Sequence, residues 1–357
     1  MKNKKNKKDA NNINPMFKQL TAKDFLSHKE DLISNMTQKK SEIGIFSVKL
    51  ANKWLEDASK RPIPNMLFGE LWYEGEICIL FADTNLGKSI LAVQIGDSIS
   101  KGRKIPYFKF EAKKQVVVYF DFELSDKQFE GRYSDNYKNH YSFNDSFFRC
   151  EISADNETNY NKKFEDLLKE SIVRTIKEKN PSVLIIDNIT FMHNEIEKSK
   201  HAGLLMKYLK DLGRKYNLSI LVIAHTPKRD LSKSITNNDL AGSKMLINFC
   251  DSVFAIGTSS LNPSYKYIKQ IKARNTEILY HLNNIIVCKI VKNNNFLEFE
   301  FVDYGNEQDH IRDLSGISQN ERKQEAKQMK AEGKSNVEIA TEFNVTEGAV
   351  RKWLKKY

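Results

Sequence analysis

The sequence predicts an α/β fold, with a mainly parallel sheet flanked by helices, followed by a small helical domain. Apolar segments rich in Val, Ile and Leu recur between helical segments without polar alternation, as expected for strands buried on both faces. One of them, 77–81, runs into a loop ending in Gly87-Lys88-Ser89 and then into an apolar helix. Residues 321–357 show helical spacing only. These three observations indicate two kinds of domain in one chain.

Length and composition limit the class of protein. The chain has 357 residues, enough for about two domains of ~150 residues. Its net charge of +11 is compatible with a nucleic-acid partner but does not by itself indicate one. The 4 cysteines include no C-x-x-C pair, and Cys78 and Cys288 lie in apolar segments typical of a core. We therefore expect a cytoplasmic protein, without a zinc site, a signal peptide or a membrane-spanning segment.

The N-terminal part precedes the first strong strand. Residues 1–15 are rich in Lys and Asn and have nothing to bury, so we expect a disordered basic tail, solvated rather than bound to nucleic acid. Residues 16–64 show mixed helical patterning and are interpreted as a helical lead-in. Pro62 and Pro64 then break the chain.

Strands and helices alternate through the central domain, which we place at residues 65–303. Strands are expected at 77–81, 115–120, 183–186, 218–224, 252–256, 265–271, 285–291 and 296–301. Helices are expected at 162–179 and 202–216. The last two strands flank 292–295 and predict a β-hairpin. Residues 304–320 are polar and are interpreted as a linker.

A phosphate-binding loop is the central motif. Residues 81–89 read FADTNLGKS, and such a loop holds phosphate oxygens with backbone N–H groups at a helix N-terminus. Lys88 reaches the β- and γ-phosphates, and the Ser89 hydroxyl can bind Mg²⁺. Ala82 stands where the G-x-x-x-x-G-K-[ST] pattern has Gly, and a positive φ there would strain Ala by ~1 kcal/mol or more. The nucleotide-binding segment comprises Ala82, Asp83, Thr84, Asn85, Leu86, Gly87, Lys88, Ser89 and Ile90.

Carboxylates end two of the other strands. Asp187 follows the strand 183–186, where a carboxylate can complete the Mg²⁺ shell opposite the loop hydroxyl; the alternative is an Asp that caps the next turn. Glu123 ends the neighbouring segment and is the candidate general base that orients the attacking water. Asp121, two residues earlier and on the same face of an extended chain, is the rival candidate.

A histidine and a basic loop follow the strand 218–224. His225 lies where ligands bind in open α/β sheets and is a candidate γ-phosphate sensor; the alternative is an ordinary strand-end His. The long loop after it carries Lys228, Arg229 and Lys233, which are candidates for contacts with a nucleic-acid backbone.

A late K-x-R-N segment, 272–275, follows the strand 265–271. Its Arg274 is a candidate arginine finger that completes a neighbouring subunit's site. The alternative is a surface ion pair.

The order of these motifs resembles the RecA/DnaB superfamily of P-loop ATPases. A P-loop is followed by a strand ending in D-x-E, a strand ending in Asp, a strand ending in a polar sensor, and K-x-R-N. The resemblance covers about residues 65–303 and extends in particular to RepA-like hexameric plasmid helicases and to ATPases of mobile elements. It implies a RecA-like core, ATP and Mg²⁺, homo-oligomeric rings such as hexamers, and single-stranded DNA passing through the ring. It also implies roles for Lys88 and Ser89 (phosphate and metal), Glu123 (base), Asp187 (metal shell), His225 (sensor) and Arg274 (finger in trans).

The C-terminal segment 321–357 predicts a helix-turn-helix. Val337, Ile339, Ala340 and Phe343 form one inner face, Asn344 lies at the turn, and Ala349, Val350, Trp353 and Leu354 form the second inner face. With a preceding helix at 321–332, the unit resembles resolvase-type and sigma-factor-type DNA-binding domains. The residues expected to face duplex DNA are Thr346, Glu347, Arg351, Lys352 and Lys355. The alternative is a helical hairpin for packing or oligomerisation.

Two functions follow from these features. The first is an ATP-hydrolysing, DNA-binding protein, namely an oligomeric helicase or replication-initiation ATPase of a plasmid or mobile element. The second is a DNA-binding transcriptional or recombination regulator that uses nucleotide as a switch. A third interpretation is a P-loop scaffold without activity.

Overall fold

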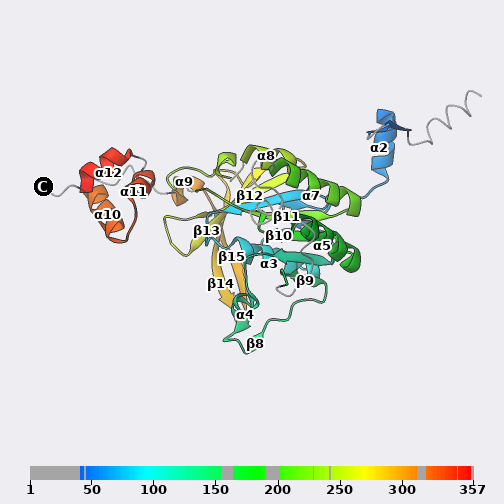
Figure 1. Ribbon diagram of the computed structural model, residues 1–357, viewed down its shortest axis with the longest axis horizontal. Coiled ribbons are helices and arrows are strands. Elements are labelled where there is room, and N and C mark those ends of the chain that lie inside the picture. The colour runs from blue at the N-terminus through cyan, green and yellow to red at the C-terminus, as the bar shows by residue number, and fades with distance from the viewer. Residues whose placement is uncertain are drawn as a thin grey trace, which may run out of the picture. The chain divides into compact units, whose positions relative to one another are not determined.

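The structure is a computed structural model that describes residues 41–43, 46–153, 164–189, 202–227, 229–240, 243–311, 319–343 and 345–354 (Figure 1). The chain divides into two compact units between Ile63 and Pro64. The expected basic tail lies outside the described residues.

The first unit contains a short hairpin and a helix. β1 (Ser41–Ile43) pairs antiparallel with β2 (Phe46–Val48), and α2 (Ala51–Ser59) follows. The expectation of a helical lead-in over 16–64 is therefore wrong for 41–43 and 46–48. Ile, Phe and Val in this segment favour extended chain because their side chains lose rotamer freedom in a helix.

The second unit is built on a nine-stranded sheet in the order β15-β14-β13-β12-β5-β11-β10-β6-β9. One part of it is parallel and consists of β5 (Ile77–Ala82), β6 (Val117–Asp121), β9 (Phe147–Cys150), β10 (Val183–Asp187), β11 (Ser219–His225) and β12 (Ser252–Thr258). The other part is antiparallel and consists of β13 (Tyr265–Lys272), β14 (Ile285–Asn293) and β15 (Phe296–Gly305). The sequence interpretation of an α/β fold with a mainly parallel sheet is confirmed.

Helices cover both faces of this sheet (Figure 1). Alternate residues of β5 enter two different cores, with Cys78 and Leu80 in one and Ile79 and Phe81 in the other. The first core includes α3 (Lys88–Lys101), and the second includes α5 (Phe164–Lys179) and α7 (Ala202–Tyr216). Burial on both faces explains why these strands lack polar alternation. The cysteines expected in the core, Cys78 and Cys288, are buried.

Several short elements complete the second unit. They are β3 (Met66–Phe68), β4 (Trp72–Tyr73), α4 (Asp126–Arg132), β7 (Ser134–Asp135), β8 (Asn139–His140), the 3₁₀ turn η1 (Asn237–Asp239), α8 (Ser243–Phe249) and α9 (Glu307–His310). The predicted hairpin is confirmed, since β14 and β15 pair antiparallel from Asn293 and Phe296 outwards. β9 is absent from the strands predicted from the sequence, because it is only four residues long and a charged residue, Arg149, interrupts its apolar pattern.

The expected linker at 304–320 begins too early. α9 follows β15 directly, and its Glu307 is fully buried. The Glu307 carboxylate pairs with Lys269 of β13 and accepts the backbone N–H of Ile235 at 2.8 Å. The buried ion pair explains the difference, because polar residues predict exposed chain unless a partner of opposite charge is buried with them. Residues 312–318 lie outside the described part of the chain.

The C-terminal residues form three helices around a core of their own. α10 (Gln319–Ala331), α11 (Asn336–Glu342) and α12 (Glu347–Leu354) bury Ala326, Met329, Ile339, Ala340, Phe343 and Val350 together. A capping box between Ser335 and Glu338 begins α11. The helical spacing of the sequence therefore placed these elements well, although the turn residue Asn344 lies outside the described residues. Among the helices that the structure describes, none combines the length and apolar character needed to cross a membrane.

Candidate nucleotide site

The site lies at the carboxyl edge of the parallel strands. β5 pairs with β11 so that Ala82 lies opposite His225, and β10 pairs with β6 so that Asp187 lies opposite Asp121. The carboxyl ends of parallel strands meet at one edge of a sheet, where ligands of such folds bind. The strand order therefore brings together residues that are far apart in the sequence.

The loop between β5 and α3 has the backbone of a phosphate-binding loop. Asn85 has φ 64° and Gly87 has φ 88°, and Gly87 is the N-cap of α3. A Cβ atom at Gly87 would lie 2.7 Å from Ile290 Cδ1 and 2.9 Å from Phe299 Cε2. Glycine is thus required here for its conformation and for the close packing of β14 and β15.

Ala82 is compatible with the loop. It is the last residue of β5, is 1% exposed and pairs with both neighbouring strands. The left-handed backbone that would strain an alanine occurs instead at Asn85 and Gly87. The missing glycine of the consensus pattern therefore imposes no strain.

Lys88 is enclosed beneath the loop. Its ammonium donates hydrogen bonds to the carbonyl oxygens of Ala82 and Asp83, both at 2.9 Å, and the residue is 7% exposed. Burial lowers the pKa of Lys88, whereas the negative charges of Asp187, Glu123 and Asp83 raise it by less. The cation thus lies within the field of the two strand-end carboxylates.

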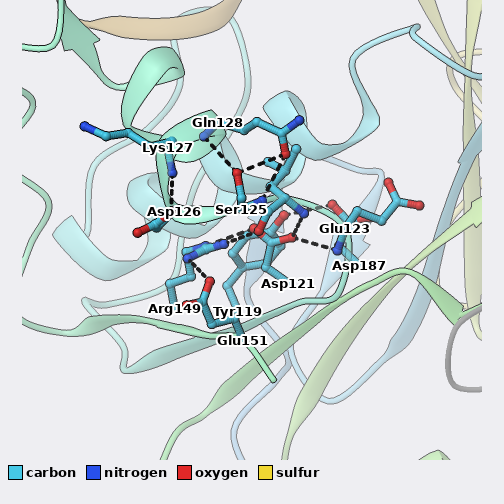
Figure 2. Close-up of polar contacts among 11 residues, drawn as sticks. Tyr119, Asp121, Glu123, Ser125, Asp126, Lys127, Gln128, Arg149, Glu151 and Asp187 are labelled. Carbon is cyan, nitrogen blue, oxygen red and sulfur yellow. Dashed lines mark hydrogen bonds and ion pairs between the residues drawn. The ribbon is translucent and has the colours of Figure 1, made fainter. Parts of the chain in front are cut away.

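Asp187, at the end of β10, lies close to Ser89 in the first turn of α3. Burial raises the pKa of Asp187 to about 6, while hydrogen bonding from Ser89 and Tyr119 acts in the opposite direction. The Tyr119 hydroxyl donates to Asp187 Oδ2 at 2.8 Å (Figure 2). Within the described residues, no well-formed hydrogen bond reaches the buried Oδ1. A buried carboxylate oxygen that lacks a well-formed hydrogen bond and lies near a serine hydroxyl is suited to a cation.

Glu123, Asn188 and His225 form a polar triangle, in which Glu123 and Asn188 follow β6 and β10 and His225 ends β11. His225 Nε2 lies 3.1 Å from Glu123 Oε1 and 3.0 Å from Asn188 Nδ2, and Asn188 Nδ2 donates to the same Oε1. The hydrogen bond from His225 is the main reason that the pKa of Glu123 is lowered. The Glu123 side chain remains 38% exposed. An ionised, accessible carboxylate therefore lies beside the loop.

The rival carboxylate, Asp121, is not available for chemistry. Its side chain is fully buried, and Oδ1 accepts the backbone N–H groups of Glu123 at 3.2 Å and Leu124 at 3.0 Å. Oδ2 is paired with Arg149 Nε at 2.9 Å (Figure 2). This arrangement favours Glu123 over Asp121 as the base. Sequence reasoning missed Arg149, and its only signal was a charged residue within the apolar segment 147–150.

Comparison with known proteins identifies the family. The family model of the AAA domain matches residues 47–230, which is just over half of the chain. The chain belongs to the AAA domain family. A search of the curated proteins found no match.

Two solved structures are similar to this AAA domain chain at 15% sequence identity each. The KaiC-like protein PH0186 of the archaeon Pyrococcus horikoshii OT3 has a TM-score of 0.43, and the match covers 64% of this chain and 91% of that one. The flagellar accessory protein FlaH of Methanocaldococcus jannaschii has a TM-score of 0.44, with 71% and 98% covered.

The basic loop of the AAA domain differs from its sequence interpretation at Arg229. The Arg229 side chain is only 5% exposed and its Nε lies 3.5 Å from Asp83 Oδ2 in the phosphate-binding loop. Asp83 also accepts a hydrogen bond from Thr226. This burial contradicts a contact between Arg229 and a nucleic-acid backbone. Lys233 is 64% exposed and pairs with Asp230, and Lys228 lies outside the described residues.

Arg274 lies at the other edge of the sheet. It follows β13, which runs antiparallel to β12, so it lies beside the beginning of β12 rather than beside the phosphate-binding loop. Its guanidinium donates to Asp251 Oδ1 at 3.0 Å and to the carbonyl of Asn248 at 2.9 Å. Lys272 donates to the carbonyls of Ile247 and Cys250. The K-x-R segment thus binds the C-terminal end of α8, where cations are favourable.

Four of the five residues expected to face DNA, namely Thr346, Glu347, Arg351 and Lys352, lie on or just before α12. Thr346 and Lys352 are exposed, and Arg351 is 66% exposed and pairs with Glu347 at 2.8 Å. Lys355 lies outside the described residues. The described part of α12 therefore presents basic groups to solvent while Val350 enters the core.

Proposed function

We propose that this AAA domain protein hydrolyses ATP with Mg²⁺ as cofactor. The observation that carries the proposal is the cluster of Glu123, Asn188 and His225 at the same sheet edge as Lys88 and Asp187. A general base, a phosphate-binding cation and a metal-binding carboxylate are the parts that phosphoryl transfer to water requires.

The residues of the site fit both ATP and Mg²⁺. The loop at 82–90 offers backbone N–H groups at the start of α3, and Gly87 keeps the loop free of a Cβ atom. Ser89 and Asp187 would hold Mg²⁺, which fits the buried Oδ1 of Asp187. When bound, Mg²⁺ supplies positive charge that stabilises the phosphate oxygens.

Glu123 acts as the base in this proposal. Within the described residues its contacts with Asn188 and His225 use Oε1, so Oε2 is the oxygen that accepts a proton from the attacking water. The lowered pKa keeps the carboxylate ionised at neutral pH. His225 shares a hydrogen bond with this carboxylate, so displacement of His225 would reorient the base, which is the behaviour of a sensor.

The test is ATP hydrolysis by the full chain with and without single-stranded DNA. Lys88→Ala should abolish turnover, because the loop cation is removed. Lys101→Ala is the matched control, since Lys101 is a partly buried lysine at the other end of α3 that pairs with Asp97. Turnover that is equal in the wild type and in Lys88→Ala would refute the proposal.

We further propose that the protein works as a homo-oligomer, with a hexameric ring as the expected form, and that Arg274 serves a neighbouring site. Arg274 lies at the sheet edge opposite its own loop, which supports action in trans only. Arg274→Gln and Lys88→Ala should each be inactive alone, yet a mixture should regain turnover because each supplies what the other lacks. Mixtures that stay inactive would refute the shared site, and mass measurement with Mg²⁺ and an ATP analogue gives the ring size.

DNA is the proposed partner, with a single strand in the ring and duplex on the helix-turn-helix, as in a helicase or replication initiator. Exposed Arg351 and Lys352 on α12 support this proposal. Lys352→Glu should weaken duplex binding of the full chain and reduce the salt dependence of that binding. Lys138→Glu, which changes an exposed lysine between β7 and β8, should do neither. Equal effects of the two variants would refute a duplex-binding role for α12.

A nucleotide-switched DNA-binding regulator is the second candidate. The separate core of α10, α11 and α12 favours it, because a unit with its own core can bind duplex without a motor. ATP-dependent duplex binding without stimulation of turnover by single-stranded DNA would support the regulator over the helicase.

A further inference from the structure

Glu123 lies in a turn rather than in a strand. β6 ends at Asp121, and α4 begins at Asp126 after the N-cap Ser125. The direction of the Glu123 side chain therefore depends on the backbone of 121–125. Figure 2 shows that this turn is surrounded by polar contacts from several elements.

Asp121 holds the turn from within. Its Oδ1 accepts the N–H groups of Glu123 and Leu124, at 3.2 Å and 3.0 Å. These bonds fix the two peptide units on either side of the Glu123 side chain. Asp121 itself is fully buried and would be costly as an unpaired charge.

Arg149 supplies the pairing charge and a second hold on the same turn. It lies on β9, next to β6, where it is opposite Tyr119. Its Nε lies 2.9 Å from Asp121 Oδ2, and its Nη2 donates to the carbonyl of Leu124 at 2.5 Å. One planar guanidinium thus joins the beginning and the end of the turn, which a lysine ammonium cannot do with the same geometry.

The outer side of the turn is fixed separately. Ser125 and Gln128 form a capping box that begins α4. Arg149 also packs over the ring of Phe129 in α4, 4.9 Å from its centroid. Strand β6, the neighbouring strand β9 and α4 therefore all meet at Arg149, and the turn has little freedom to rotate.

We propose that Arg149 and Asp121 are positioning residues that direct Glu123 towards His225 and Asn188. The Asp121 side chain is fully buried and that of Arg149 is 16% exposed, so both are assigned to holding the turn and not to binding nucleotide. The inference rests on the proposed ATP hydrolysis and assigns to β9, the edge strand next to β6, a role in that reaction. A base displaced by about 1 Å can lose on the order of 100-fold in rate, so this clamp controls kcat rather than nucleotide affinity.

The test combines kinetics with amide hydrogen exchange on the full chain. Arg149→Met and Arg149→Lys should lower kcat by about 10- to 100-fold, with the larger loss for Met, and leave the Kd of a fluorescent ATP analogue within about 3-fold. Exchange at the amides of Glu123 and Leu124 should rise. Lys127→Met is the matched control, since Lys127 is an exposed cation in the first turn of α4.

A double variant separates positioning from general damage. In the Glu123→Gln background, Arg149→Lys should have no further effect on kcat, because the base it positions is already gone. A further loss would overturn the inference, and so would unchanged amide exchange or a loss of nucleotide affinity equal to the loss of kcat. If the wild type lacks turnover that depends on Lys88, the proposed function fails, while the exchange of the two amides still decides whether the clamp exists.

Discussion

The two ends of the parallel strands carry similar residues in opposite states. At the carboxyl edge, Glu123 is 38% exposed, and a histidine lowers its pKa. At the other edge, Glu76 is 3% exposed, and burial raises its pKa. Donors occupy both Glu76 oxygens, with Asn275 Nδ2 at 2.7 Å on one and Ser252 Oγ at 2.8 Å on the other. A carboxylate such as that of Glu76, with hydrogen bonds to both oxygens, stabilises the packing of the strands. A carboxylate such as that of Glu123, with one accessible oxygen, can take part in a reaction.

The largest expected effect is at the open edge. Glu123→Gln should lower kcat by about 10²- to 10⁴-fold, the usual contribution of a general base, because the amide cannot accept the proton from water. Thermal stability should change little, since the side chain is partly exposed. Steady-state ATP hydrolysis with a melting curve checks both. Glu130→Gln, which alters only exposed contacts with Lys127 of α4 and His140 of β8, is the control, and an equally slow control would contradict the assignment.

The closed edge should respond in stability and not in rate. Glu76→Ala leaves Ser252, Asn275 and the N–H of Tyr73 without their acceptor, so we expect a loss of about 2–4 kcal/mol in the free energy of unfolding. Urea unfolding measures it. The kcat of the folded fraction should stay near the wild-type value, and a selective loss of kcat would end the distinction between the two edges.

Asp187 provides a test of the open edge by pH. Its pKa of about 6 in the folded protein lies above the ordinary value of 3.8, so the folded state binds the proton more tightly. Stability from this group is present at low pH and is lost as pH rises from about 4 to about 6, by about 3 kcal/mol in all. Metal-free urea unfolding should show this slope in the wild type relative to Asp187→Asn. A difference that does not vary with pH would contradict it.

The sequence predicts which residues meet at the carboxyl ends of the parallel strands. It does not predict the contacts that depend on how an edge strand or a long loop packs against them. Asp187 and His225 each end a buried strand, and Glu123 follows the end of β6 by two residues, so their meeting follows from the parallel sheet alone. The pairing of Arg149 with Asp121 depends instead on a short edge strand next to β6. The burial of Arg229 against Asp83 likewise depends on the path of a long loop. Such contacts join residues of distant segments and leave no periodic signal in the sequence.

Arg274 shows a second limit of sequence-based prediction, which concerns contacts between subunits. The order K-x-R-N predicts a finger for a neighbouring subunit, and the structure supplies local partners for the side chains of Lys272, Arg274 and Asn275. Both roles use a cation near an accessible surface. They differ only in whether a second subunit offers a stronger acceptor than Asp251, which is a property of the assembly rather than of the local sequence.

Ala82 joins the two edges, because β5 runs from the cluster around Glu76 to the phosphate-binding loop. Ala82→Gly restores the consensus pattern, yet we expect no gain in nucleotide affinity, since Ala82 is an extended strand residue. It should cost about 1–2 kcal/mol in stability, from the lost buried methyl group and the greater entropy of glycine in the unfolded chain. Binding of a fluorescent ATP analogue and urea unfolding measure the two effects. A marked rise in nucleotide affinity in Ala82→Gly would contradict this expectation. Residue 82 would then act as part of the phosphate-binding loop rather than as the last residue of β5.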